Sequence, residues 1–176
     1  MKKVLKIIGI AVLAFFALAF FVGFFGGDAG TSSTPAPAPA QAPKVYRTGE
    51  TWTVNGQWEL TVNGIEEQYS RNEYADKYPA AVYVVSFTYT NIGYTDQNGI
   101  MDGLFFSMDN SVIDSKGTMG YSYPGDIAYY PQEAPIGATC KGQVCIGVDN
   151  PGLPIKLNVV QYDGTGQKQA ATFSVE

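Results

Sequence analysis

Residues 80–93 read AAVYVVSFTYTNIG, and this stretch decides the fold. It is the longest run of β-branched and aromatic residues in the chain, and it carries no charge. Apolar residues occupy both parities of the alternation, so we expect a central strand that is covered on both faces. Pro79 precedes the run, and Asn91-Ile92-Gly93 predicts a turn that ends it.

The composition favours strands and turns over helices. Aromatic residues make up 14% of the 176 residues, glycines number 20, and charged residues are only 15%. From Lys44 onward there are 8 basic and 15 acidic residues, a net charge of −7. Such a surface repels a phosphate backbone, so we expect no nucleic-acid partner. The chain has no histidine, which removes the usual proton shuttle, zinc ligand and Ser-His or Cys-His pair.

The N-terminal residues 1–27 are expected to contain a transmembrane helix or a signal peptide. Lys2, Lys3 and Lys6 precede an uncharged apolar run over 7–25, which as a helix would span about 28 Å, close to a bilayer core. Cleavage as a signal peptide is the main alternative and a buried helix a lesser one, but the run is long and its distal end is bulky. We expect a retained anchor. The flanking lysines predict a cytoplasmic N-terminus and an extracellular remainder.

Residues 28–43 are expected to form an extracellular linker. Alternating proline and alanine cannot form a helix or a sheet ladder and favour an extended polyproline II conformation. We expect a semi-rigid stalk that carries a folded domain over 44–176.

That domain is predicted to be an all-β, antiparallel sandwich of seven or eight strands. Turn signals, among them Asn55-Gly56 and 163–166, separate short runs that alternate or are uniformly apolar. The longest connections, 66–78 and 116–137, are rich in tyrosine. The expected strands are 48–54, 57–62 with Ile65 continuing, 80–90, 103–108, 111–114, 140–148, 157–162 and 170–175.

The order of several strand motifs resembles a known family. These motifs are Gly49-Glu50-Thr51, the run from Trp58 to Val62, the run from Tyr83 to Gly93, and the run from Lys141 to Val148. Together they are similar to a bacterial extracellular immunoglobulin-like domain of unknown function, related to the mycobacterial immunoprotective extracellular antigen. The resemblance covers residues 49–175 and implies an immunoglobulin-like sandwich outside the cell. It implies no catalytic residues.

Cys140 and Cys145 are the only cysteines. On a straight strand they would lie about 16 Å apart on opposite faces, too far for a bond. A disulfide therefore requires the chain to fold back between them, which Gly142 would permit. The even cysteine count and an oxidising location favour the bond, and we expect it as a structural staple.

The acidic residues are expected to be solubilising groups on turns and outer strand faces. Asp109, Asn110, Ser111 and Asp114 are a conceivable site for a hard cation, but they do not fit the calcium-loop pattern. We expect no metal, no cofactor and no catalytic residue. A carboxylate-based hydrolase is the weakest of the functional hypotheses.

Tyrosines in the long connections are the best candidates for ligand binding. Loops at the end of a sandwich can present aromatic rings to a sugar or to a protein partner. The alternative is that these rings fill the ends of the sandwich or bind backbone through their hydroxyls. We therefore expect a non-catalytic extracellular binding module, with a carbohydrate- or cell-wall-binding domain as the alternative. Trp52 and Trp58 are expected in the core. The candidate contacts are Tyr121, Tyr123, Tyr129 and Tyr130, with Tyr69, Tyr74 and Tyr78 as a second group.

Overall fold

The structure is a computed structural model that describes residues 44–99, 101–109 and 111–176. The predicted anchor and linker, residues 1–43, lie outside the described residues. In the described ranges there is no helix long and apolar enough to cross a membrane.

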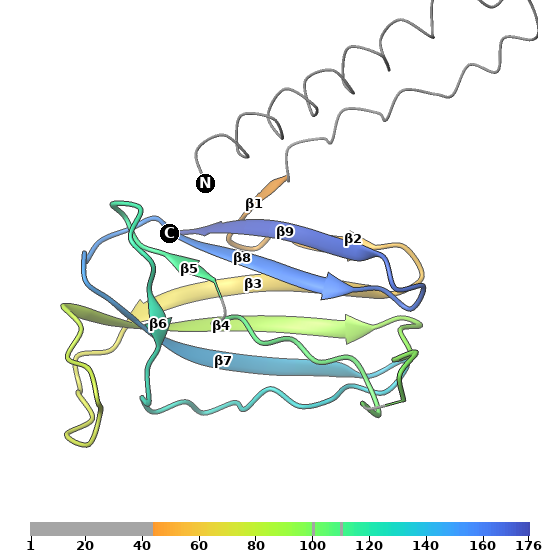
Figure 1. Ribbon diagram of the computed structural model, residues 1–176, viewed down its shortest axis with the longest axis horizontal. Coiled ribbons are helices and arrows are strands. Elements are labelled where there is room, and N and C mark those ends of the chain that lie inside the picture. The colour runs from red at the N-terminus through yellow and green to blue at the C-terminus, as the bar shows by residue number, and fades with distance from the viewer. Residues whose placement is uncertain (1–43, 100, 110) are drawn as a thin grey trace, which may run out of the picture. The chain divides into compact units, whose positions relative to one another are not determined.

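Two sheets pack face to face to form a β-sandwich (Figure 1). One sheet has five strands in the order β2-β3-β4-β7-β6, and the other has four in the order β1-β9-β8-β5. All pairs are antiparallel except β1 with β9. The strands are β1 Val45–Arg47, β2 Thr51–Val54, β3 Trp58–Glu67, β4 Ala81–Asn91, β5 Val112–Ile113, β6 Tyr121–Ser122, β7 Thr139–Val148, β8 Ile155–Tyr162 and β9 Lys168–Val175.

Strand β4 is the centre of the five-stranded sheet, as the sequence predicted. It pairs with β3 on one side and with β7 on the other. Its odd-numbered residues face the other sheet, and Val85 and Phe87 there are almost completely buried. Val82 is buried on the opposite face, in a separate small cluster. The inner face is therefore fully covered, and the outer face is buried at Val82 and partly exposed farther along the strand.

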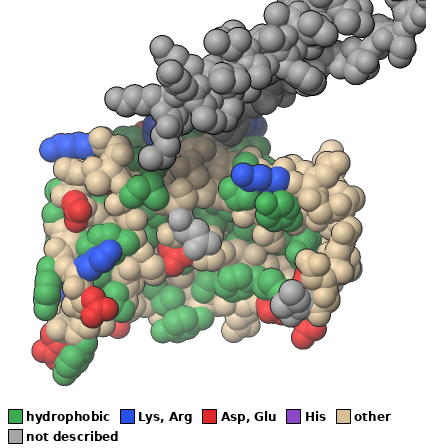
Figure 2. Space-filling view, viewed as in Figure 1, with side chains coloured by type: hydrophobic (Ala, Val, Ile, Leu, Met, Phe, Trp, Pro, Cys, Tyr) green, Lys and Arg blue, Asp and Glu red, His purple; other side chains and the backbone are tan. Residues whose placement is uncertain are grey.

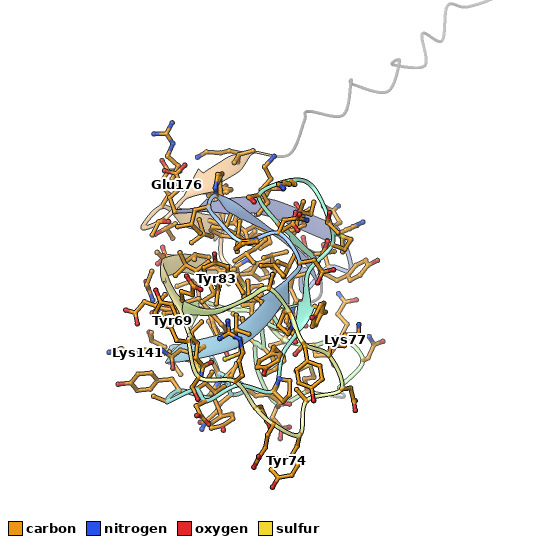
Figure 3. All side chains as sticks on the ribbon, turned by 90° about the vertical axis from the view of Figure 1, so that its left-hand side faces the viewer. Tyr69, Tyr74, Lys77, Tyr83, Lys141 and Glu176 are labelled. Carbon is orange, nitrogen blue, oxygen red and sulfur yellow. The ribbon has the colours of Figure 1, made fainter. Side chains whose placement is uncertain are left out.

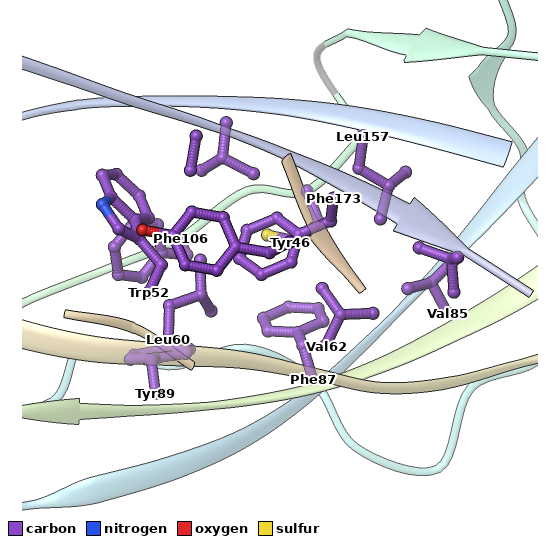
Figure 4. Packing of buried hydrophobic residues seen from close by; sticks show 14 of the residues in the cluster. Tyr46, Trp52, Leu60, Val62, Val85, Phe87, Tyr89, Phe106, Leu157 and Phe173 are labelled. Carbon is purple, nitrogen blue, oxygen red and sulfur yellow. The ribbon is translucent and has the colours of Figure 1, made fainter. Parts of the chain in front are cut away.

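The core between the sheets is rich in aromatic rings (Figure 4). Trp58 meets Trp52, Tyr94 and Phe106 edge to face at ring-centroid distances of 5.6 to 5.8 Å, a favourable geometry for aromatic pairs. The predicted core role of both tryptophans is confirmed. The inward faces of the sheets also contribute Leu60, Val62, Val85, Phe87, Tyr89, Ile146, Val148, Leu157, Val159, Ala171, Phe173 and Val175.

The strands differ from the sequence-based prediction in three places. Residues 103–108 are not a strand: Leu104 forms an isolated bridge with Ala134, while Phe106 and Met108 pack into the core without a ladder. Their sequence alternates as in a strand, but alternation indicates only which side chains are buried and not whether the backbone pairs with a neighbour. Strand β1 was not predicted, because its three residues gain their order from parallel pairing with β9. Strand β6 lies inside a segment that was expected to be a loop.

Asn91 fixes the end of β4. It is fully buried, and its side-chain amide donates to the carbonyl oxygens of Tyr94 (3.1 Å) and Ala134 (2.9 Å). Its side-chain oxygen accepts the Tyr94 N–H at 2.8 Å. A buried amide must be satisfied in this way, so Asn91 joins two loops to the central strand.

Candidate functional site

Tyr121 and Tyr123 are structural residues of the outer face of the five-stranded sheet. Tyr123 is buried in a small cluster with Val82 and Cys145, and Tyr121 packs against the same cluster. The Tyr123 hydroxyl accepts the backbone N–H of Asn72 at 2.8 Å, which joins the two long connections. Tyr121 and Tyr123 therefore pack against the protein itself. Of the four candidate tyrosines, Tyr123 and Tyr130 line one common depression of about 320 Å³.

A cation also rests on Tyr121. The Lys77 ammonium nitrogen lies 4.4 Å from the centroid of the Tyr121 ring. Gly147 lies against this ring, because a Cβ atom there would approach a Tyr121 ring carbon to 2.8 Å. Tyr121 is thus packed from two sides, which limits its use as a contact for a ligand.

Tyr129 and Tyr130 are different, because 55% and 68% of their surfaces are exposed. Gln143 of β7 fixes the backbone beneath them: its N–H donates to the Tyr129 carbonyl oxygen at 2.8 Å. Its side-chain oxygen accepts the N–H groups of Ala128 (2.8 Å) and Tyr129 (3.3 Å). Its side-chain amide donates to Ser86 at 3.1 Å. Two exposed aromatic rings are thus carried on a backbone that hydrogen bonds hold in place.

These two tyrosines border an open groove of about 490 Å³, named here the Tyr129–Tyr130 groove. Its polar lining includes Glu133, Thr139 and Lys141, which can donate or accept hydrogen bonds. The same groove is lined by Cys140, whose side chain is partly buried. The groove therefore combines exposed rings with charges of both signs.

The Tyr89 hydroxyl supports this region from the core. It donates to the Gln132 carbonyl oxygen and accepts the Gln132 N–H at 3.2 Å. Burial, together with the neighbouring Cys140 thiol, raises the pKa of Tyr89 well above its usual value. Tyr89 is therefore a neutral structural group at working pH, and it connects β4 to the loop that forms the groove.

Tyr69, Tyr74 and Tyr78 are the most exposed aromatic residues, at 80%, 85% and 79%. They belong to the connection between β3 and β4, and Figure 3 shows Tyr74 at the outer end of this loop. Tyr74 lines a smaller depression with Arg71. The exposure of these three tyrosines makes them available for contact, and none of them stacks on another ring among the described residues.

The predicted disulfide between Cys140 and Cys145 is wrong in this structure, which has both thiols free. Strand β7 is continuous, with Cys140 opposite Tyr89 and Cys145 opposite Val84. The two side chains therefore lie on opposite faces of the sheet. Gly142 does not fold the chain back: it faces Phe87, whose ring would approach an added Cβ atom to 2.6 Å. Burial raises the pKa of the Cys145 thiol.

Asp109 and Asp114, the carboxylates of the conceivable cation site, accept hydrogen bonds from neighbouring residues. Asp114 is 4% exposed and accepts the N–H groups of Lys116, Thr118 and Asn150. Burial opposes ionisation there, but the Asn150 amide (2.7 Å) and these backbone groups lower the pKa of Asp114 overall. Asp109 accepts the Ser107 hydroxyl. In the part of the chain that the structure describes, no group of three or more Cys, Asp or Glu residues could hold a metal ion.

Sequence reasoning missed a second groove, of about 660 Å³, beside the end of β8. Its lining includes Phe105, Val160 and Tyr162, and 48% of Val160 and 58% of Tyr162 are exposed. The available signal was the apolar outer face of residues 157–162, where Val160 and Tyr162 alternate with core residues. Nothing in the sequence places Phe105 beside them.

Comparison with known proteins gives one structural similarity. No family model matches the chain, and no curated protein matches it. The chain is similar to the crystal structure of MPT63, a secreted protein from Mycobacterium tuberculosis. The two are 14% identical, and the similarity covers 77% of this chain and 99% of that one, with a TM-score of 0.49. The resemblance to the extracellular immunoglobulin-like family in particular stays a prediction.

Proposed function

We propose that this protein is a non-catalytic binding module of the immunoglobulin-like type, held outside the cell by an N-terminal membrane anchor. The lysine-flanked apolar run over 7–25 and the proline-alanine linker support this location. A linker of that composition is suited to keep a folded domain clear of a membrane surface.

The observation that carries the binding function is the pair Tyr129 and Tyr130 on the edge of a groove. Both rings are exposed, while hydrogen bonds from Gln143 fix the backbone that carries them. Tyrosine offers a large contact area and a polar hydroxyl, and few rotamers are lost when it is held by a ligand. Tyrosine is also one of the residues enriched where a protein interface carries most of its binding energy.

The ligand of this surface is a protein partner or, as the alternative, a glycan of the cell wall. The Tyr129–Tyr130 groove places Glu133, Thr139 and Lys141 beside the two rings. A sugar ring has apolar C–H faces that stack on aromatic side chains, and hydroxyls that bind charged and hydroxyl groups. The groove supplies both kinds of contact.

The absence of catalysis is supported by how the polar groups are used. The Asp114 carboxylate accepts hydrogen bonds from its own loop and from Asn150, and the chain contains no histidine. A catalytic acid or base must itself come within hydrogen-bond reach of the proton that it transfers, and the Asp114 carboxylate is occupied by these internal hydrogen bonds.

The test is a binding experiment with the full chain in detergent and with insoluble peptidoglycan as the probe. We expect the double variant Tyr129→Ala/Tyr130→Ala to bind at least tenfold more weakly than wild type. The matched control is Tyr74→Ala/Tyr78→Ala, which also removes two exposed rings and is expected to bind as wild type does.

Failure of wild-type protein to bind peptidoglycan or any glycan on an array would eliminate the glycan candidate. The same two variants are then compared against an extracellular protein fraction. Equal binding by wild type and by Tyr129→Ala/Tyr130→Ala would refute the assignment of the contact surface.

A further inference from the structure

The outer edge of β8 is paired over only half of its length. Strand β5 pairs with Leu157 and Lys156, and the Asn158 N–H donates to the Ser111 carbonyl oxygen at 2.9 Å. Beyond Asn158, the described residues offer β8 no further backbone partner on this side. Alternate residues of a strand direct their backbone groups to the same edge. Val160 and Tyr162 therefore direct theirs away from β9, as Asn158 does.

The edge opens onto the second groove, which shares no lining residue with the Tyr129–Tyr130 groove. Tyr94 and Phe106 line it from below, and each meets the buried Trp58 ring edge to face at 5.8 Å. Phe105 and Met101 also contribute apolar surface. Figure 2 shows hydrophobic side chains exposed on the face where β8 and β5 lie. The groove floor is thus an outward extension of the aromatic core.

The charged residues that line this groove have one sign, although Lys168 lies opposite Tyr162 on the neighbouring strand β9. Asp96 and Asp163 line it, and no lysine or arginine of the described chain does. Each carboxylate also accepts backbone N–H groups of its own turn, which hold it in place. The Thr165 hydroxyl and the other hydrogen bonds lower the pKa of Asp163 to about 2, so it stays ionised. A cationic segment is complementary to such a groove, whereas a second copy of this acidic domain is not.

The other edges of the sandwich are less open. The outer edge of β7 is bonded to β6 and, at Gln143, to the Tyr129 carbonyl oxygen. Strands β1 and β2 are only 3 and 4 residues long. Short or covered edges are how sheets avoid unwanted pairing. The β8 edge differs because a groove with both apolar and acidic lining residues lies beside its open backbone groups.

We propose that the β8 edge binds an extended peptide segment of another protein as an added strand. The segment pairs its backbone with Val160 and Tyr162, places apolar side chains on the groove floor, and carries flanking lysine or arginine near Asp96 and Asp163. The open edge from Val160 to Tyr162, two steps of about 3.3 Å, is matched by about three residues of the segment, with flanking residues on each side of them. Main-chain hydrogen bonds supply affinity in this mode of recognition, and alternate side chains supply specificity.

The experiment selects seven-residue peptides from a random displayed library against the full chain in detergent. The selected peptides are then measured against Val160→Pro and its matched control Val160→Thr. Proline removes the N–H that faces the open edge and leaves the β8–β9 ladder intact, so the fold is retained. We expect apolar peptides with flanking lysine or arginine that bind Val160→Thr as wild type, but bind Val160→Pro at least tenfold more weakly.

A second measurement leaves the protein unchanged. Each selected peptide is synthesised with backbone N-methyl groups on odd or on even residues, and we expect only one of the two sets to lose binding. Selection of no peptide above background, or equal loss from both methylated sets, would overturn the proposal. So would full binding by Val160→Pro. A dimer in sedimentation that Val160→Pro dissociates would assign the edge to a second copy instead.

Discussion

Substitution of Gly142 by alanine tests the packing around the central strand. Gly142 lies opposite Phe87 in the β4–β7 ladder, and an added Cβ atom would meet three carbons of the Phe87 ring at 2.6, 2.7 and 3.2 Å. The ring is 1% exposed and is stacked on Tyr89, so it has little room to move. Overpacking of this kind costs about 1–3 kcal/mol, and we expect Gly142→Ala to lose about 2 kcal/mol of unfolding free energy.

The assay is urea denaturation followed by tryptophan fluorescence, since Trp52 and Trp58 are both buried. The midpoint is expected to fall while the slope with denaturant stays constant. The control is Gly64→Ala, where an added Cβ atom meets nothing within 4 Å.

A double-mutant cycle makes the test specific. Phe87→Leu replaces the ring that the new methyl group meets with a smaller side chain. Gly142→Ala should therefore lower the free energy of unfolding less in that background than in wild type. Wild-type stability in Gly142→Ala, or strict additivity in the cycle, would refute the packing argument.

Three further outcomes follow from the same structure. Asn91→Ala leaves buried backbone groups unsatisfied, so its free energy of unfolding, measured by urea denaturation, should fall by about 3 kcal/mol. The exposed control Asn63→Ala should lose less than about 1 kcal/mol, and equal losses in the two variants would contradict the role of Asn91. The folded pKa of Asp163, about 2, lies below its unfolded value, so the stability it contributes above about pH 4 is lost as the pH falls towards 2. Asp163→Asn should weaken that acid dependence in thermal melts, and an unchanged pH profile would count against the hydrogen-bond network. Alkylation without reductant should modify Cys140 quickly and Cys145 slowly, while a mass 2 Da below that of the reduced chain would establish the disulfide.

The central strand could be predicted from sequence because its signal is local. Residues 80–90 combine β-branched and aromatic residues on both parities, which predicts a strand with other parts of the chain packed on both of its faces. The alternation in residues 157–162 and 170–175 was also a local signal: both segments are strands as expected, and Leu157 and Phe173 are buried in the core.

The segment 103–108 shows where pattern reasoning fails. Its alternation reports burial of Leu104, Phe106 and Met108, but a strand also needs a neighbour with free backbone groups. The cysteine prediction failed on a related point. Gly142 has two explanations in sequence, a reverse turn or a close contact, and only the position of Phe87 distinguishes them.

The candidate site stays a prediction, but the structure separates the tyrosines of this connection by burial: Tyr123 is 4% exposed and Tyr130 is 68% exposed. Sequence could not make this distinction, because the small cluster that buries Tyr123 is formed by residues from β4, β7 and the preceding loop.

The most direct test of the binding assignment places a photoreactive phenylalanine analogue at single positions in cells. The account predicts cross-linked adducts with cell-envelope components from position 130 and few from the control, position 74, which is more exposed (85% against 68%). Adducts from position 74 alone, or none from position 130 under illumination, would contradict it.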